Sequence, residues 1–526
     1  MRNWIGPVID RGQTRLFYPT LEEMIGESDP VRIVDEILSS IDWSEAEDNY
    51  ESHLGRTTYH CQDLCALLIF GLLMGIRSSR KLEYACKKNI DFIWLLWGRV
   101  PDHSTIAAFH AESSSLVKSV FAQVGRIALD MGYIALVDVA TDGTQVRSNN
   151  SRFATATREK LEERLAKLNE FLATGLEELA AEDEKDTQQH GDSNPQTEVP
   201  EELSSKEERE EKLKKSYQRE KEKIEKAMEE VDKVDEARRK RGEQKPGQVP
   251  LHESESRVLP NKDGGYAPNV TPVVSTDSKH GFIVDVDVIN DSDEAGVQRA
   301  AVDRIEETFG KKPECMLGDG AFISTEHIVA MEEAGVELLA PVKDSSPQED
   351  SPALREDLHE PVATEQLPQL PMNPQTKKFD KSCFCYDAAD DCYYCPNGER
   401  LDFQKIENKG DERIIRMYQS SDCSNCSLSS ECLNNPPTPR TIQISIHEPL
   451  RQKVIDRMST DAGKQRYNMR SWIAETPFAY IKQTMGIRQF LLKGLLHVKD
   501  EFLWACTPCN IGKLTRLMAG VRTPRA

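Results

Sequence analysis

Apolar residues near the start of the chain are grouped with the spacing of helices. Thr20 can cap a helix that begins at Leu21. Two apolar segments, 62–76 and 80–97, are compatible with helices, and a further helix is expected to end near Gly132. Residues 1–132 are therefore predicted to form an all-helical domain.

The pattern then changes to short apolar segments of β type. The first, 133–140, ends at Thr-Asp-Gly-Thr, and later segments alternate with helical ones. Such alternation predicts an α/β core with a mixed sheet. The further strands are expected at 269–276, 281–289, 314–317 and 336–342, and the helices between them at 294–309 and 325–334.

A long charged segment interrupts this core. Residues 157–245 are rich in Glu, Lys, Arg, Ala and Leu, with charge pairs at i, i+4 spacing. Residues 181–202 are polar enough to be disordered. The segment predicts an inserted helical hairpin with a flexible tip, and a purely solvated spacer is the alternative.

The remaining chain divides by composition. Residues 344–380 are acidic and Pro-rich, a cysteine cluster follows, and the chain from residue 446 is helical and basic. After the N-terminal domain, we predict an α/β core in three parts (133–156, 261–343 and 446–526), a charged insertion (157–260) and an acidic and Cys-rich insertion (344–445).

Charge and length restrict the function. The 526 residues carry a net charge of −22, which alone argues against nucleic acid as a partner. However, residues 171–210 hold 13 acidic and 3 basic side chains, whereas 451–526 hold 14 basic and 5 acidic ones. The local balance therefore permits a DNA-binding C-terminal region. Without a bilayer-length apolar segment or an apolar signal at the N-terminus, a cytoplasmic protein without a membrane partner is expected.

Two Asp residues stand beside glycine where strands are expected to end. Asp142 follows the first strand and Asp319 follows the strand at 314–317. An Asp in a turn next to Gly is common, so each is weak evidence alone. Together with a third acid, however, they suit a pair of divalent ions that cleave phosphodiesters, because Mg²⁺ or Mn²⁺ prefers carboxylate oxygens.

Glu475 is the candidate for the third acid. Tyr467, Arg470, Glu475 and Lys482 are spaced so that they lie near one side of a helix, or of two helical turns with a break. Pro477 suits a first helical turn, so a helix is expected to begin near Glu475. An amphipathic basic helix with an incidental Glu is the alternative.

These motifs resemble the DDE transposases of bacterial insertion sequences, in the branch with a Y-R-E-K signature. Tyr467, Arg470, Glu475 and Lys482 match that signature, with one residue more than usual between Arg and Glu. The sequences around Asp142 and Asp319 match the first and second acidic motifs. The similarity covers roughly 17–145 and 262–515.

The resemblance implies an RNase H-like core that binds two Mg²⁺ (or Mn²⁺) ions through Asp142, Asp319 and Glu475. It implies cleavage at transposon ends followed by strand transfer, with Tyr467, Arg470 and Lys482 contacting DNA or its phosphates. The partners would be the terminal inverted repeats and target DNA, bound by a homodimer. Rival carboxylates ranked below these three are Asp138, Asp277, Asp285 and Asp287.

The cysteine cluster has the spacing of a metal site. Two C-x-x-C pairs, separated by 27 residues, suit tetrahedral Zn²⁺ and are followed by one more Cys. Few apolar residues surround them, so a small knuckle folded by its metal is expected. An iron–sulfur cluster and unligated thiols are the alternatives. The resemblance favours Cys395, Cys423, Cys426 and Cys432 as ligands, with Cys392 as a fifth candidate.

Two other functions compete with an active transposase. One is a catalytically inactive, transposase-derived DNA-binding protein, which the presence of all three acids disfavours. The other is a zinc-stabilised scaffold built around the charged insertion, which leaves the two Asp-Gly strand ends without a role.

Overall fold

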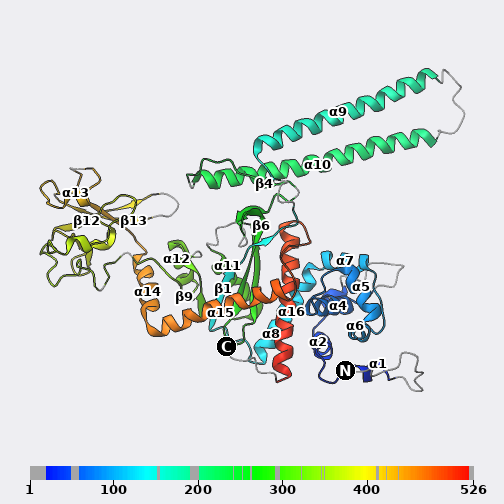
Figure 1. Cartoon of the computed structure of the whole chain (residues 1–526), viewed down its shortest axis with the longest axis horizontal. Coiled ribbons are helices and arrows are strands. Elements are labelled where there is room, and N and C mark those ends of the chain that lie inside the picture. The colour runs from blue at the N-terminus through cyan, green and yellow to red at the C-terminus, as the bar shows by residue number, and fades with distance from the viewer. Residues whose placement is uncertain are drawn as a thin grey trace, which may run out of the picture. The chain divides into compact units, whose positions relative to one another are not determined.

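A computed structural model of the chain describes residues 19–48, 59–150, 155–189, 201–240, 242–251, 253–260, 264–290, 296–320, 323–344, 346–348, 350–409, 414–421, 423–435 and 438–520. The described residues form two units of a mixed α/β protein (Figure 1). The first unit takes its residues from Met1–Glu294, Ala300–Pro313 and Arg470–Ala526, and the second from Ala295–Arg299 and Glu314–Met469.

The first unit begins with helices, as the apolar spacing predicts. Thr20 caps the first of them, and its hydroxyl accepts a hydrogen bond from the Glu23 amide. The segment expected as one helix over 80–97 is two helices, because Asn89 ends one and caps the next. The helices are α1 (Leu21–Met24), α2 (Pro30–Ser39), α3 (Ser44–Asp48), α4 (Cys61–Leu73), α5 (Ser79–Lys88), α6 (Ile90–Leu95), α7 (His103–Glu112) and α8 (Ser114–Asp130).

The sheet of the first unit is organised around one long strand, β6 (Tyr266–Asp277). It pairs antiparallel with four others, which are β1 (Asp138–Gly143), β2 (Val146–Arg147), β5 (Arg257–Pro260) and β7 (Ile283–Ile289). The first strand thus begins at Asp138 rather than at residue 133, and it includes Asp142 instead of ending before it.

Helix α16 (Leu495–Met518) joins the helical part of this unit to its sheet. It packs against α8, α4 and β7. Trp504 and Phe502 are at most 1% exposed there, and burial of each such side chain contributes about 2–3 kcal/mol. Cys506 and Cys509 are buried in the same helix. A further helix, α11 (Val297–Phe309), follows β7 in sequence.

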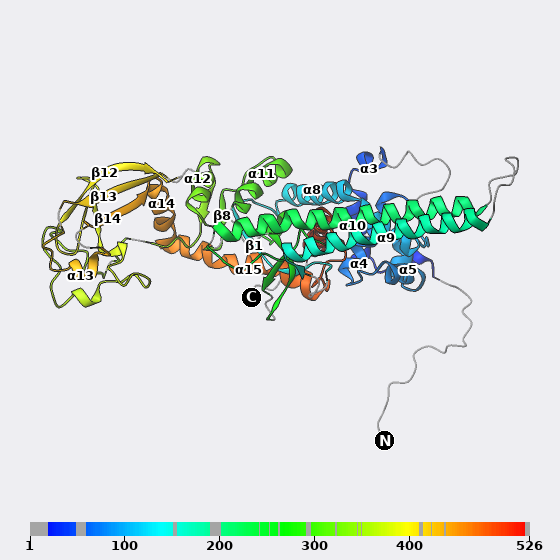
Figure 2. The ribbon, with the colours of Figure 1, turned by 90° about the horizontal axis from the view of Figure 1, so that it is seen from above.

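The charged insertion is a hairpin of α9 (Arg158–Gln189) and α10 (Glu201–Lys240), which lie side by side in both views (Figures 1 and 2). This confirms the helical prediction. At its base, β3 (Thr155–Ala156) pairs with β4 (Val249–Pro250), and Leu161, Ala227 and Val231 form a small buried core. The stretch expected to be disordered is helical at 181–189 and 201–202, and the rest of it lies outside the described residues.

The second unit contains a parallel strand pair, β8 (Cys315–Leu317) and β9 (Glu337–Leu339), joined by α12 (Thr325–Glu333). Helix α14 (Glu448–Ser459) packs on α12 and β9. These elements agree with the expected strands and helix at 314–342.

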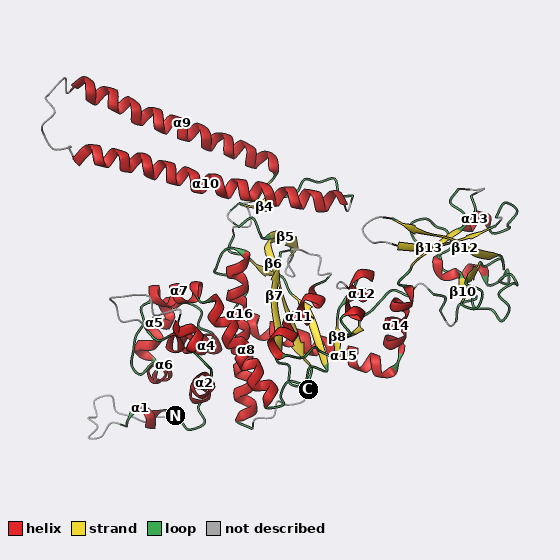
Figure 3. Ribbon diagram, turned by 180° about the vertical axis from the view of Figure 1, so that it is seen from behind, coloured by secondary structure: helices red, strands yellow, loops and turns green. Residues whose placement is uncertain are grey.

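The Cys-rich part of the second unit is a five-stranded antiparallel sheet, drawn in yellow in Figure 3. Fourteen buried residues, among them Tyr418 and Leu401, form its core. This corrects the expectation of a small knuckle that only a metal could fold. Much of the segment 344–380 lacks regular structure but contributes Ala353 and Leu370 to this core. The strands are β10 (Cys385–Asp387), β11 (Cys392–Tyr394), β12 (Arg400–Asn408), β13 (Ile414–Ser420) and β14 (Thr441–Ser445), with α13 (Ser429–Cys432) beside them.

Helix α15 (Asp461–Gln483) carries the predicted signature and takes residues from both units. It is continuous, with Pro477 inside it, so no helix begins near Glu475. Among the described residues, no helix is both long and apolar enough to cross a bilayer.

Candidate active site

Asp142 lies inside β1, opposite Val274 of β6. Its neighbour Thr141 is fully buried, with its hydroxyl 3.0 Å from that of Ser275. Successive side chains of a strand point to opposite faces, so Asp142 is directed away from this buried pair. Its side chain is 24% exposed, which leaves the carboxylate accessible to an ion or a substrate.

Helix α15 meets this strand at two places. Arg470 Nη1 lies 3.8 Å from Asp142 Oδ1, with the guanidinium side chain 16% exposed. Further along the helix, Lys482 Nζ donates hydrogen bonds to Thr144 Oγ1 (2.6 Å) and to the Gln145 carbonyl (3.3 Å). The structure therefore brings Arg470 and Lys482 to the strand end that holds Asp142.

Glu475 stands on α15 between these two cations, and its side chain is exposed. Ser471 Oγ donates to Glu475 Oε1 at 3.3 Å, one turn away. Since the helix starts at Asp461, its partly positive N-terminus is about 20 Å from Glu475. The N-terminus of α15 therefore does not support Glu475, because that effect is confined to the first turn.

Asp319 belongs to the second unit, where it follows β8 and is exposed. The turn before it is held by a buried polar pair. Gln298 donates from Nε2 to the Leu317 carbonyl (3.2 Å), and its Oε1 lies 3.0 Å from Nε2 of His327. A Cβ at Gly318 would lie 2.8 Å from Gln298 Nε2. Gly318 is therefore needed for close packing rather than for an unusual φ angle.

The charge state of His327 follows from its surroundings. It is 3% exposed, and burial lowers its pKa to about 4. The neutral ring can donate from Nε2 to Gln298, and its buried Nδ1 has no hydrogen-bond partner among the described residues. Tyr467, the first residue of the signature, is half-buried and also belongs to the second unit.

Three of the four rival carboxylates have structural roles, namely Asp277, Asp285 and Asp287. Arg304 Nε and Nη2 bond both oxygens of Asp285, at 2.7 and 2.8 Å, and Lys499 Nζ lies 2.6 Å from Asp287. Burial raises the pKa of Asp285 against the opposing effect of Arg304. Asp277 Oδ2 accepts the amides of residues 135 and 136. These acids hold the sheet and its connections together.

Four thiols line one cavity of about 20 Å³ in the Cys-rich part of the second unit. No three of their sulfur atoms lie within 4.8 Å of one another. Burial, and to a smaller extent the neighbouring thiols, raises the pKa of Cys432 to about 12, so this thiol is protonated near neutral pH when no cation is bound. The four are Cys395, Cys423, Cys426 and Cys432. The family resemblance favours the same four as metal ligands.

Cys392 lies elsewhere. Its sulfur is within 4.8 Å of carboxylate oxygens of Asp387 and Asp390, and it is not among the residues that line the thiol cavity. Cys392, the fifth candidate for a zinc ligand, therefore does not belong to the four-thiol cavity.

Two parts of the chain match known protein families. Residues 394–515 match the family Transposase DDE domain, and residues 19–112 match the family Transposase domain (DUF772). These two matches support an insertion-sequence DDE transposase. The first match contains Glu475, Lys482 and the four thiols that line the cavity, whereas Asp142 and Asp319 lie outside both matched ranges. No curated protein matches the chain.

Glu501 and Arg77 secure the segment that follows Lys482. The sequence pattern did not indicate either residue. Glu501 is 4% exposed and accepts hydrogen bonds from the Leu491 and Leu492 amides. Arg77 donates to Glu501 (3.0 Å) and to the carbonyls of Gly486 and Gln489. The one sequence signal was an acid inside the apolar stretch of α16, which gives no indication of its partners.

Proposed function

We propose that this transposase cleaves DNA at the ends of its element and joins the freed 3′-hydroxyl to target DNA, with divalent ions held by Asp142, Asp319 and Glu475. The core around β1 and β6 would then be RNase H-like, and α15 would carry the third acid of the site.

The observation that carries the proposal is the way α15 meets β1. Its contacts at Arg470 and Lys482 flank the position of Glu475 and lie at the strand end that holds Asp142. An acid on a strand, a second on a helix and two cations beside them suit a bound phosphodiester, because the cations offset its negative charge. A purely structural helix would not need two cations at the strand end that holds Asp142.

The donor chemistry fits hard divalent ions. Asp142 is partly exposed and Glu475 and Asp319 are exposed, so all three can offer oxygen atoms to Mg²⁺ or Mn²⁺. Two such ions, when bound, would activate the attacking oxygen and stabilise the leaving one. The protein groups would align the scissile phosphate between the strand and the helix.

Each signature residue then has a role. Arg470 offsets the charge of Asp142 and would be free to contact a phosphate once a cation replaces it there. Lys482, fixed by Thr144 and Gln145, would contact a neighbouring phosphate. Tyr467 would pack near the site or against a base.

The thiol cavity supports a structural Zn²⁺ ion. Cys395, Cys423, Cys426 and Cys432 would supply four sulfur ligands and leave no open position, so the ion would not take part in catalysis. Because the surrounding sheet has its own apolar core, the ion would fix the local loops rather than drive folding of the whole sheet.

The expected partners are the terminal inverted repeats and target DNA, with the N-terminal helices as a DNA-binding surface. Two DNA ends must be brought together for transposition, so a homodimer on DNA is proposed.

Metal-dependent nicking of a duplex with the element's own terminal repeats tests the proposal. Alanine at Asp142, Asp319 or Glu475 should each lower the rate by at least about 10³-fold, since a lost metal ligand removes several kcal/mol of transition-state stabilisation. DNA affinity should remain within about threefold. Asp461→Ala, an exposed acid on the same helix as Glu475, is the matched control and should nick normally.

Two results would contradict the proposal. Undiminished nicking by the triple alanine variant would show that these acids are not the metal ligands. Tight binding of the repeats without any nicking by the wild-type protein would instead favour the inactive, DNA-binding alternative.

A further inference from the structure

The connecting segment, residues 484–494, joins α15 to α16 and begins two residues after Lys482. Its first part continues the end of α15, because the Met485 amide donates to the Tyr480 carbonyl and the Ile487 amide to that of Ile481. Met485 is 1% exposed and Ile487 is 2% exposed. The position of this segment therefore determines where the end of α15 lies.

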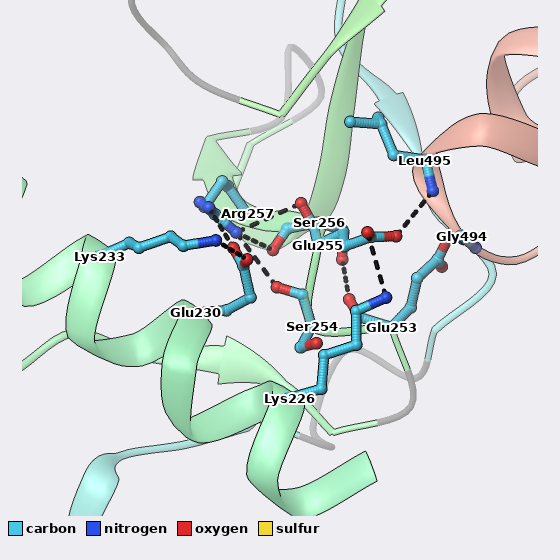
Figure 4. Close-up of polar contacts among 10 residues, drawn as sticks. All are labelled: Lys226, Glu230, Lys233, Glu253, Ser254, Glu255, Ser256, Arg257, Gly494 and Leu495. Carbon is cyan, nitrogen blue, oxygen red and sulfur yellow. Dashed lines mark hydrogen bonds and ion pairs between the residues drawn. The ribbon is translucent and has the colours of Figure 1, made fainter. Parts of the chain in front are cut away.

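Two acids from the base of the hairpin hold the other end of the connecting segment (Figure 4). Glu253 Oε1 accepts the Gly494 amide at 3.0 Å, and Glu255 Oε2 accepts the Leu495 amide at 2.9 Å. Gly494 has a φ of +86°, which favours glycine. Leu495 begins α16, so both carboxylates also stabilise the N-terminal end of a 24-residue helix.

Glu255 and the neighbouring Arg257 are tied to α10. Lys226 Nζ lies 3.2 Å from Glu255 Oε1, and Arg257 Nη2 lies 2.7 Å from Glu230, which is 7% exposed. Figure 4 shows these pairs on the α10 side and Gly494 and Leu495 on the other. A cavity of about 90 Å³ lies at this junction, so polar contacts rather than close apolar packing connect the hairpin to α16.

The same network reaches the chain that follows Asp142. Asn150 Nδ2 donates to Glu253 Oε2 (3.2 Å), and Asn149 Nδ2 donates to the Leu491 carbonyl (2.6 Å). The Phe490 amide donates to the Arg147 carbonyl (2.9 Å). The hairpin base, the chain after β1 and the connecting segment thus share one set of hydrogen bonds.

We infer that the base of the hairpin positions the active site: Glu253 and Glu255, through Gly494 and Leu495, fix the connecting segment and hence the end of α15 that carries Lys482. This inference rests on the proposed function. It gives the insertion a part in strand cleavage, in which Glu253 and Glu255 are positioning residues that touch neither DNA nor metal.

The burial of Glu253 favours a positioning role over stability alone. An acid that is 5% exposed, as Glu253 is, is costly to bury, and an apolar residue would stabilise the junction at least as well. A carboxylate adds direction, because its charge-assisted bonds place a particular backbone amide to within a few tenths of an ångström. A misplacement of about 1 Å at a reacting group can cost about 10²-fold in rate.

Glu255 is the better residue to change, because its side chain is 28% exposed and its loss should not unfold the protein. Glu255→Ala should lower the single-turnover nicking rate about 10-fold, and the double variant with Glu253→Ala about 10²-fold. Glu255→Gln keeps an oxygen for the Leu495 amide and should restore most of the rate. DNA affinity, measured by fluorescence anisotropy, should stay within about twofold throughout.

Lys233→Ala is the matched control on the hairpin. Its side chain is 66% exposed and pairs with Glu230, so its removal should leave the rate unchanged. A folded Glu255→Ala variant, and a folded double variant, with wild-type nicking rates would overturn the inference. So would equal losses in the Gln and Ala variants, which would indicate that the hydrogen bond is not the cause.

Failure of the proposed function is a separate outcome. If the Asp142→Ala protein nicks DNA like the wild type, the catalytic assignment fails whatever the Glu255 variants do. If Asp142→Ala is inactive while the Glu255 variants match the wild type, only the positioning inference fails.

Discussion

Replacing Glu501 by alanine is expected to destabilise the first unit by about 3–5 kcal/mol. The carboxylate is 4% exposed and its partner Arg77 is 18% exposed. The change therefore leaves the Arg77 guanidinium without its acid and with little solvent to replace it. The Leu491 and Leu492 amides also lose their acceptor. Removal of one partner from a buried ion pair typically costs this much.

The Arg77→Ala change should cost less, about 2–3 kcal/mol, because Glu501 keeps both amide donors. The double variant should cost less than the sum of the two, with a coupling energy of about 1–3 kcal/mol. Guanidinium unfolding followed by tryptophan fluorescence measures these values, since Trp504 is fully buried in the same helix.

Lys87→Ala is the reference for an ordinary ion pair. Lys87 is 48% exposed and pairs with Glu83 one turn away, so its loss should cost less than about 0.5 kcal/mol. A cost below about 1 kcal/mol for Glu501→Ala, or strict additivity in the double variant, would refute the view that this pair holds the connecting segment.

Three further predictions concern the second unit. Gly318→Ala should lower its unfolding free energy by about 1–3 kcal/mol, because the new Cβ meets Gln298; an unchanged denaturation midpoint would count against the close packing. His327 has a pKa of about 4 and about 6.5 when unfolded, so the unfolded chain binds more protons between these values. The unfolding free energy should therefore fall by about 3 kcal/mol from pH 6.5 to 4, a dependence that His327→Gln should flatten in pH-dependent denaturation. Elemental analysis should find about one Zn²⁺ per chain and almost none after Cys426→Ser. The variant should keep its β-sheet signal in far-ultraviolet circular dichroism, because the sheet has its own core. Loss of that signal would contradict the independent core.

Features with a local cause could be predicted from the sequence. The cap at Thr20 needs a hydroxyl and a nearby amide, and the hairpin needs charge pairs within each helix, so both follow from neighbouring residues. The strands around Asp142 and Asp319 were found because apolar segments and glycine punctuation mark them, although the first strand includes Asp142 rather than ending before it.

Features that depend on packing between distant parts of the chain could not be predicted from the sequence. Pro477 suggested a helix start, yet α15 continues through it. The Cys-rich sheet was missed because its apolar residues are spread thinly over five short strands and a long irregular segment. Glu253, Glu255 and Glu501 resemble solvated acids in the sequence, since the amides they accept are contributed by other parts of the chain.

The neck of the hairpin has an evolutionary consequence. Thr155 pairs with Pro250 and Ala156 with Val249, so the insertion leaves and re-enters the core at one two-stranded ladder. Once such a loop is closed, a doubling of its length costs only about 0.6 kcal/mol in chain entropy. Descendants of this protein could lengthen, trim or exchange the outer arm almost freely, provided that the neck and the turn around Glu253 are retained.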